Sequence, residues 1–168
     1  HTVHNNILTE SILAVHTVHR EQFFTNIAKG GKVTQSSMFG PERTIDGNHA
    51  SNWHLGSCTH TQRDKNPWWR LDLLKTYEIN TVTITIRGDC CQERINGAEI
   101  RIGNSLKDNG NTNPRCAVIS STEHGTSKTF MCNGMEGRYV NVVIPGRQEY
   151  LTLCEVGSFL VNVVIPGR

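Results

Sequence analysis

The clearest periodic stretch of the chain lies at residues 80–87, where one valine and two isoleucines alternate with three threonines. A period of two residues is typical of a β-strand with one buried face. Trp68 and Trp69 are expected to pack in the core. Connectors rich in Gly, Asn and Pro separate further short apolar runs, which we expect to be strands at 68–74, 98–102, 117–120, 128–132, 138–144 and 151–159. Many short strands without a long amphipathic helix predict an all-β fold, an antiparallel β-sandwich.

Length and charge narrow the class of protein. The 168 residues fit one domain with a tail. A net charge of +2, with 17 scattered lysines and arginines, gives no basic surface for nucleic acid. No apolar run approaches the ~18 residues that a membrane span needs. We therefore expect no nucleic acid partner and no membrane span.

The cysteines indicate an oxidising compartment. The chain has six, an even number, without a Cys-x-x-Cys pair. This pattern favours disulfides over a zinc site, although the spacing alone does not choose among the possible pairings. The chain begins at His1 with neither Met nor a signal peptide, as expected for a processed protein. We therefore predict a secreted, extracellular protein.

Both ends of the chain contain repeated peptides. His-Thr-Val-His occurs at 1–4 and 16–19, and Val-Asn-Val-Val-Ile-Pro-Gly-Arg occurs at 140–147 and 161–168. A sequencing artefact is one explanation, and a duplicated edge strand near the C-terminus is the other. We expect residues 1–25 to be an N-terminal extension of unassigned role. The second octapeptide, 161–168, is expected to be a C-terminal tail or an extra edge strand.

The octapeptide Arg-Gly-Asp-Cys-Cys-Gln-Glu-Arg at 87–94 contains the most unusual chemistry. Neighbouring Cα atoms lie ~3.8 Å apart, whereas ordinary disulfides join Cα atoms roughly 4.4–6.8 Å apart. A bond between Cys90 and Cys91 would therefore close a small ring that folding alone does not require. Such a ring offers a flat, polarizable surface between two guanidinium groups with fixed donors. An apolar plate flanked by donors suits a sugar, which has one apolar face and a rim of hydroxyls.

Together with His60, this octapeptide forms a spaced pattern. Between His60 and the Arg-x-Asp at 87–89 lie 26 residues, and four more precede Arg94. The pattern resembles the signature of the F-type lectins, a family of fucose-binding agglutinins. Supporting segments are Gly-Ser-Cys-Thr-His, Asn-Pro-Trp-Trp-Arg-Leu-Asp-Leu and Leu-Cys-Glu-Val, within about 26–159. The resemblance implies a jelly-roll-like sandwich of the galactose-binding-domain type over 26–160.

The resemblance also implies a sugar site for L-fucose and fucosylated glycans. His60, Arg87 and Arg94 are expected to converge on the axial 4-hydroxyl and adjacent oxygens of fucose. Asp89 is expected to orient the guanidinium groups rather than contact the sugar. The residues alone leave simpler interpretations open, namely a polar loop histidine and arginines that are solvated or paired with Asp89 or Glu93.

Two further pairs would complete this sugar site. The resemblance places a Cys90–Cys91 disulfide beneath the sugar ring. It places Trp53 and His54 at the aromatic positions that border the methyl group of fucose. Core packing is the alternative for Trp53. The Arg-Gly-Asp at 87–89 also permits a cell-adhesion interpretation, which we disfavour because the tripeptide leads directly into the paired cysteines.

The resemblance implies all three disulfide pairings, which are Cys58–Cys154, Cys90–Cys91 and Cys116–Cys132. The first and third close long chain loops and are expected to contribute roughly 3–5 kcal/mol each by the chain-entropy model. The vicinal pair closes no such loop, so its role is expected to be local.

A structural calcium ion is the expected cofactor. Ca²⁺ takes six to eight oxygen ligands, including backbone carbonyls. Two segments that the Cys58–Cys154 bond would bring together supply such oxygens. The ligands that match the family are Asp46, Asn48, Ser57 and Glu155, with Arg43 offering its carbonyl. The alternative is an Asp-Gly-Asn turn without an ion.

These features predict a secreted, non-enzymatic lectin that acts in glycan recognition or agglutination in innate defence. The family resemblance adds a homo-oligomer, specifically a trimer. The main alternative is a discoidin-like module that binds phospholipid or protein with apolar loop tips on the same sandwich. An enzyme is disfavoured because glycoside hydrolysis usually needs two facing carboxylates, and no nucleophile–base arrangement is apparent.

Overall fold

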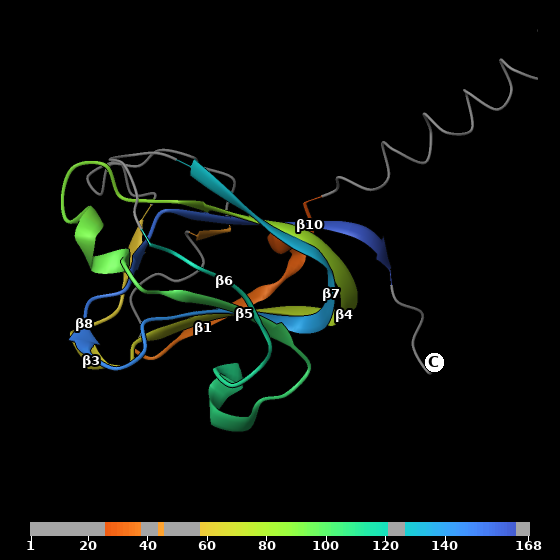
Figure 1. The fold of residues 1–168 in the computed structure, drawn as a ribbon, viewed down its shortest axis with the longest axis horizontal. Helices are drawn as coiled ribbons and strands as arrows, with labels where there is room; N and C mark the ends of the chain where they lie inside the picture. Colours follow the sequence, from red (N-terminus) through yellow and green to blue (C-terminus); the bar gives the residue numbers. More distant parts are fainter. Residues whose placement is uncertain (1–25, 38–43, 46–57, 121–126, 164–168) are drawn as a thin grey trace, which may run out of the picture.

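The computed structural model describes residues 26–37, 44–45, 58–120 and 127–163, with side chains described as far as Gly157 (Figure 1). Strands dominate this part of the chain. They are β1 (Lys32–Gln35), β2 (Thr59–His60), β3 (Asp64–Lys65), β4 (Trp68–Thr85), β5 (Glu99–Gly103), β6 (Arg115–Val118), β7 (Ser127–Val143), β8 (Gln148–Glu149), β9 (Thr152–Leu153) and β10 (Glu155–Val163). Short 3₁₀ helices occur at η1 (Ala28–Gly30), η4 (Gln92–Ile95) and η5 (Lys107–Gly110).

Two long strands, β4 and β7, form the spine of the fold. Each combines two of the strands expected from sequence, 68–74 with 80–87 and 128–132 with 138–144. The polar and glycine-rich segments between them suggest turns, but in the structure they continue the strands across a bend. The bend lies where the β4–β7 register shifts after Asp72, next to a positive φ of 70° at Leu74.

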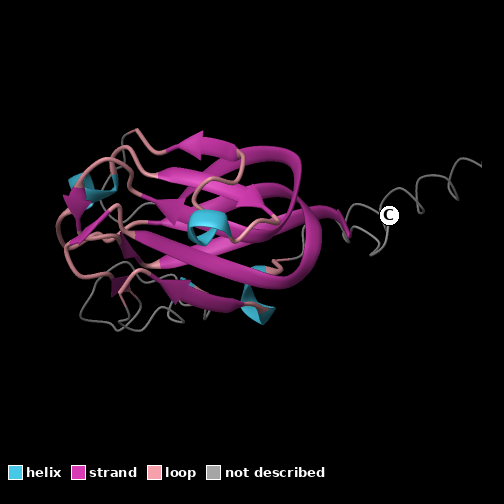
Figure 2. Cartoon of the chain, turned by 90° about the horizontal axis from the view of Figure 1, so that it is seen from below, coloured by secondary structure: helices cyan, strands magenta, loops and turns pink. Residues whose placement is uncertain are grey.

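The bend divides the sheet into two layers. The first part of β4 pairs with β1 and with the end of β7, which in turn pairs with β5 and then β6. The second part of β4 pairs with β10 and with the start of β7. Strands that change layers through bulges and bends are a known way of building a sandwich, and Figure 2 shows these long strands curving over. Every strand pairing is antiparallel, as expected.

The core follows from alternation along the strands. Trp69 and Leu71 are fully buried on the inner face of β4, and Trp69 donates its indole N–H to Thr44 Oγ1 at 2.9 Å. Their inner partners are aliphatic, chiefly Ile79, Val82, Ile84, Ile100, Ile102, Val140, Val142 and Ile144. The expectation that Trp68 also packs in the core is wrong, because adjacent strand residues point to opposite faces. Trp68 is half-buried on the outer face, where Arg70 stacks on its ring.

The three expected disulfides are all present, and no cysteine is free. Cys116–Cys132 links β6 to β7. Cys58–Cys154 joins residues 96 positions apart, directly before β2 and directly after β9. This bond lies beside the antiparallel β2–β9 pair, in which His60 faces Thr152. It therefore brings an early segment of the chain to the end of the domain.

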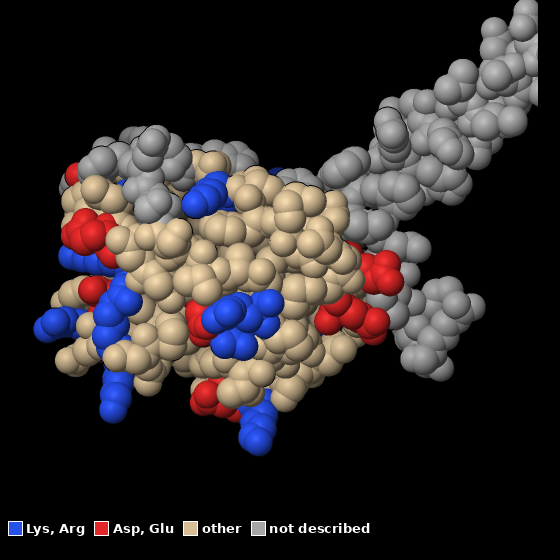
Figure 3. Space-filling model, in the orientation of Figure 1, with Lys and Arg blue, Asp and Glu red and all other residues tan. Residues whose placement is uncertain are grey.

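The remaining features concern the ends and the surface. The backbone of β10 continues to Val163, with Asn162 opposite Glu78, whereas residues 1–25 and 164–168 lie outside the described residues. No helix in the described part is long and apolar enough to cross a membrane. On the face shown in Figure 3, acidic and basic side chains are interspersed.

Candidate ligand-binding site

The residues expected to bind sugar come from three segments of the fold. His60 lies on β2, and Arg87 follows the end of β4 after the buried Ile86. Cys90 and Cys91 form a turn, and Arg94 lies on η4 directly after it. The green η4 lies at the same end of the molecule as β3 and β8 (Figure 1). Loops at the end of a rigid sandwich are a common location for binding residues.

His60 is held from both its ring and its backbone. Its Nδ1 lies 2.7 Å from the Thr61 carbonyl oxygen. A carbonyl oxygen only accepts, so Nδ1 carries the hydrogen and Nε2 is the acceptor nitrogen of the neutral ring. Gln35, which is buried, donates its Nε2 to the His60 carbonyl oxygen at 3.1 Å. These contacts fix the orientation in which His60 presents Nε2.

Arg87 and Asp89 form a bidentate ion pair. Nε of Arg87 donates to Oδ1 of Asp89 at 2.8 Å, and Nη2 donates to Oδ2 at 2.9 Å. The hydrogen bond to Asp89 raises the pKa of Arg87, which therefore stays charged. The pair uses two of the five guanidinium N–H donors, and its planar geometry orients the other three. The role of Asp89 in orienting Arg87 toward a sugar stays a prediction, because the same ion pair also fits the simpler alternative of an arginine paired with Asp89.

The vicinal disulfide sets the path of the chain between the two arginines. Cys91 has a left-handed conformation, with φ of 68°, and immediately precedes η4. The Arg94 N–H donates to the Cys91 carbonyl oxygen at 3.2 Å. Arg94 therefore follows the disulfide on the next short helical turn, with its backbone N–H bonded to Cys91.

Tyr150 connects His60 and Arg94, and it was missed in the sequence analysis. The guanidinium carbon of Arg94 lies 4.8 Å from the Tyr150 ring centroid. The His60 ring meets the same tyrosine edge-on, with centroids 6.2 Å apart. A signal for Tyr150 existed, because an antiparallel register continued from the expected Cys58–Cys154 bond places residue 150 near the β2 segment.

Arg147 is a second supporting residue that the sequence analysis did not identify. Its Nη2 donates to the carbonyl oxygens of Arg94 and Asn96, at 2.8 and 2.7 Å. These bonds hold the end of η4 against the segment that leads into β8. Arg147 therefore holds the backbone of Arg94 in position and is not itself one of the proposed sugar-binding residues.

The other expected residues lie mostly outside the described part of the chain. This holds for Trp53 and His54 of the sugar site and for four of the expected calcium ligands, Arg43, Asp46, Asn48 and Ser57. Glu155 is described, and it is 3% exposed at the start of β10, next to Cys154. Within the described residues, no group of three or more His, Cys, Asp or Glu side chains is placed to hold a metal.

The arrangement suits a ligand with several neighbouring hydroxyls. Two guanidinium groups supply charged donors, the imidazole supplies an acceptor, and the Cys90–Cys91 disulfide supplies an apolar surface between the arginines. The nearby Asp89 carboxylate is occupied by its bidentate pair with Arg87. The described geometry thus favours binding over acid–base chemistry, which needs a carboxyl group poised to transfer a proton.

Comparisons with known proteins identify the family and the fold to which the chain is similar. A family model described as a NedA-like, galactose-binding domain matches residues 43–142. Fucolectin-1 of Anguilla japonica is 51% identical over 150 residues, which cover 84% of this chain and 82% of that protein. A serum f-lectin (fucolectin) from Morone saxatilis superposes with a TM-score of 0.80 at 56% identity over 84% of this chain. These matches support the jelly-roll-like, galactose-binding-domain type of sandwich expected from sequence.

More distant structures and the lengths of the relatives add two facts. A Streptococcus pneumoniae fucose binding module superposes with a TM-score of 0.70 at 29% identity, covering 82% of this chain and 96% of the module. The chain spans 48% of the Morone saxatilis fucolectin. It spans 35% of a pentraxin fusion protein from Xenopus laevis, to which it is 48% identical. Some relatives therefore contain substantial further sequence beyond the region shared with this chain.

Proposed function

Because the chain belongs to the F-type lectin (fucolectin) family, we propose that it binds terminal L-fucose on glycans through His60, Arg87 and Arg94. The observation that carries this proposal is the contact of both Arg94 and His60 with Tyr150. The bidentate Arg87–Asp89 pair, which follows β4 in the chain, adds the second guanidinium group. The names of the related fucolectins and of the bacterial fucose binding module support the choice of sugar. As a member of a lectin family, the chain is not an enzyme.

Each group has a distinct task in the proposed complex. The two guanidinium groups donate to neighbouring sugar oxygens, and Nε2 of His60 accepts from a hydroxyl. Charged donors make hydrogen bonds roughly twice as strong as neutral ones. The Cys90–Cys91 disulfide covers the apolar face of the ring, and Trp53 with His54 borders the methyl group. The Asp89 pair keeps Arg87 from adopting other rotamers.

Glycan-array binding of the purified chain, with and without free L-fucose as competitor, tests this function. We expect binding to fucosylated glycans that free L-fucose abolishes and free D-glucose leaves unchanged. The alternative is a discoidin-like module, for which vesicles of anionic phospholipid are the matched probe. Vesicle binding without any fucose-sensitive glycan binding would overturn the proposal.

Tyr150 provides a prediction about the positions of His60 and Arg94. Tyr150→Phe keeps the ring that contacts Arg94 and His60, so fucose affinity is expected to stay within about twofold of the parent chain. Tyr150→Ala removes a cation–π contact of about 0.5–2 kcal/mol and is expected to weaken binding several-fold. Isothermal titration with L-fucose measures both variants. Equal losses for Phe and Ala would instead implicate the hydroxyl group.

We further propose that the chain holds a structural calcium ion at Arg43, Asp46, Asn48, Ser57 and Glu155. The described member of this set, Glu155, is a buried carboxylate next to Cys154, whose disulfide partner Cys58 directly follows Ser57 in the chain. Asp, Asn, Ser and Glu oxygens are the hard ligands that Ca²⁺ prefers. The ion would fasten the segment before Cys58 to the start of β10.

Chelation tests the calcium proposal. Excess EGTA is expected to lower Tm, because removal of a ligand that binds only the native state removes its stabilisation. Fucose affinity is expected to fall less, since the ion does not contact the sugar. The variant Glu155→Gln should have a lower Tm that no longer responds to EGTA. An EGTA-insensitive melting curve of the unmodified, calcium-loaded chain would contradict the calcium site.

The cellular context is also part of the proposal. We infer that the protein is secreted, forms a homo-oligomer such as a trimer, and recognises or agglutinates fucosylated cells in innate defence. The disulfide bonding of all six cysteines supports an oxidising compartment. Several weak sugar sites on one oligomer would raise the avidity for a cell surface. Light scattering measures the oligomeric state, and agglutination assays measure the recognition of fucosylated cells.

A further inference from the structure

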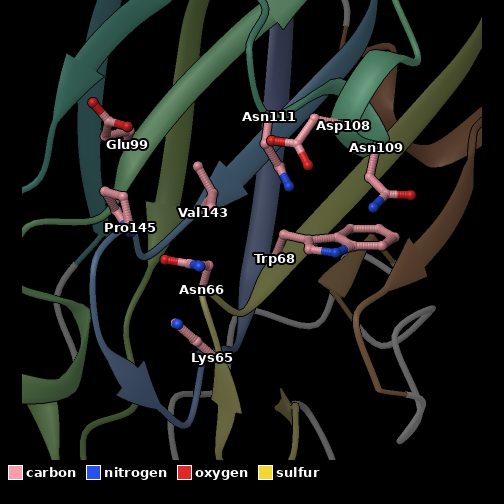
Figure 4. Close-up of a pocket in the computed structure, with 9 residues that line it drawn as sticks. All are labelled: Lys65, Asn66, Trp68, Glu99, Asp108, Asn109, Asn111, Val143 and Pro145. Carbon is pink, nitrogen blue, oxygen red and sulfur yellow. The ribbon is translucent and has the colours of Figure 1, made fainter.

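A polar groove on the outer face of the sheet lies apart from the residues of the proposed fucose site. It has a volume of about 440 Å³ and is lined by Lys65, Asn66, Trp68, Glu99, Asp108, Asn109, Asn111, Val143 and Pro145 (Figure 4). None of these residues is His60, Arg87 or Arg94, and none belongs to the Cys90–Cys91 disulfide. The volume lies within the range of roughly 300–1,000 Å³ that is usual for ligand pockets.

The floor of the groove is one row of the sheet. Val143 on β7 is paired with Trp68 on β4 and with Glu99 on β5, so the three residues lie side by side across the strands. Figure 4 shows Asp108, Asn109 and Asn111 entering from the η5 side. Lys65 and Asn66 lie on the opposite side. The floor of the groove therefore has an apolar part, formed by Trp68 and Val143, with the Glu99 carboxylate at one end, and polar walls lie on two sides.

The wall formed by η5 is fixed by buried contacts. Asn141, which is fully buried, donates its Nδ2 to the Asn109 carbonyl oxygen and to Asn111 Oδ1, both at 2.9 Å. Arg70 donates to the same Asn109 carbonyl at 2.9 Å while its guanidinium stacks 5.0 Å from the Trp68 ring centroid. One arginine thus orients both the floor and the wall. Asp108 and Asn109 both have positive φ, of 51° and 59°.

The walls offer both donors and acceptors. Within the described residues, the Asp108 carboxylate and the Asn109 carboxamide make no side-chain hydrogen bond that would occupy them. Glu99 accepts from Arg101 and Arg115 at 3.1 Å. Burial alone would raise the pKa of Glu99, but these hydrogen bonds outweigh it and hold the pKa below its usual value. Glu99 therefore remains an ionised acceptor at the end of the groove.

The lining excludes several classes of ligand. Two carboxylates against one lysine disfavour a phosphate or other anion. The Glu99 oxygens are already engaged by arginines, which leaves too few oxygen ligands for a metal ion. The polar walls disfavour a wholly apolar ligand. A saccharide fits the remaining description, because its apolar face matches Trp68 and its hydroxyls both donate to carboxylates and accept from carboxamides.

From this geometry we propose that the groove is a second saccharide-binding site, independent of the fucose site. One domain would then hold two sugars at separate places. The residues that carry the second site are Trp68 as the apolar platform and Asp108 and Asn109 as hydrogen-bonding partners. The inference does not rest on the proposed function, and failure of either leaves the other testable.

The test uses the full chain carrying Arg94→Ala, so that binding at the proposed fucose site does not contribute. Methyl glycosides of galactose, glucose, mannose, N-acetylglucosamine and N-acetylgalactosamine are titrated while assigned NMR signals of the Trp68 indole and the Asn109 carboxamide are followed. We expect at least one glycoside to shift both signals saturably. Asp108→Asn should raise its Kd about tenfold, because an acceptor is exchanged for a donor.

Two further variants separate binding from folding. Trp68→Leu should also weaken binding about tenfold or more if the ring is the platform. Lys107→Ala is the matched control, because this exposed η5 residue does not line the groove, and it should leave Kd unchanged. If Trp68→Leu fails to fold, Asp108→Asn alone tests whether the groove binds the glycoside. The proposal is overturned if no glycoside gives a saturable shift. It is also overturned if only a non-sugar control compound, Nα-acetyl-lysine methyl ester, gives one.

Discussion

Replacing Arg94 with alanine is expected to abolish measurable fucose binding while the chain stays folded. The change removes a charged donor from a site whose other groups remain partly desolvated, at a cost of about 1.5–3 kcal/mol or more. It also removes the cation that stacks on Tyr150. Arg94→Lys should rescue little, because a point charge does not reproduce the planar fork. Titration with L-fucose measures the affinity, and a thermal melt shows whether the chain stays folded.

Arg87→Ala is expected to have a similar effect for a second reason, since it leaves the Asp89 carboxylate without its bidentate partner. Arg138 offers a matched control. It forms the same kind of bidentate pair with Asp72, at 2.8 and 3.0 Å, but between neighbouring strands of the sheet. Arg138→Ala should therefore change Tm about as much as Arg87→Ala and leave fucose affinity unchanged. Fucose binding within about twofold of the parent chain by either Arg87→Ala or Arg94→Ala would mean that the site lies elsewhere.

The sequence predicted the fold class because local alternation determines which face of a strand is buried. The threonine–isoleucine alternation at 80–87 corresponds to the second part of β4, and Ile84 is fully buried as the pattern required. The continuity of β4 through its bend was not predictable in this way. Its polar middle segment is stabilised by pairing with β7, which is 50 or more residues away in sequence for most pairs. Trp68 and Trp69 show the same limit, since an apolar pair does not reveal which member points inward.

The site shows a similar division between local and long-range information. The spacing of His60, Arg87 and Arg94 was visible in one dimension, and so was the Arg87–Asp89 pair. Tyr150 was visible only indirectly, through the strand register that continues from the expected Cys58–Cys154 bond. Arg147 was not visible, because it approaches the site only through its bonds to the carbonyl oxygens of Arg94 and Asn96. The outer groove is still less visible in sequence. It depends on a sheet row formed by three strands and on a loop held by the buried Asn141.

The vicinal disulfide gives the second large expected effect. Cys90→Ser with Cys91→Ser should keep a Tm near that of the parent chain and bind fucose poorly. The bond closes no long chain loop, so its removal costs little of the entropy that disulfides usually supply. Its loss removes the apolar surface and lets the turn at Cys91 relax. Because the backbone of Arg94 is bonded to the Cys91 carbonyl oxygen, Arg94 is then expected to shift. Binding sites of this kind lose affinity when groups shift by about 1 Å.

The Cys116–Cys132 bond supplies the opposite case in the same molecule. It joins β6 to β7 across a sequence separation of 16 residues. Cys116→Ser with Cys132→Ser should therefore cost about 3 kcal/mol, or about 6–12 °C in Tm for a chain of this size. Fucose affinity should change little at temperatures where this variant is folded. If the vicinal variant melts as early as the Cys116–Cys132 variant, the vicinal bond is a structural staple. If it binds fucose as tightly as the parent chain, the sulfur surface has no part in recognition, and the arginines alone must position the sugar.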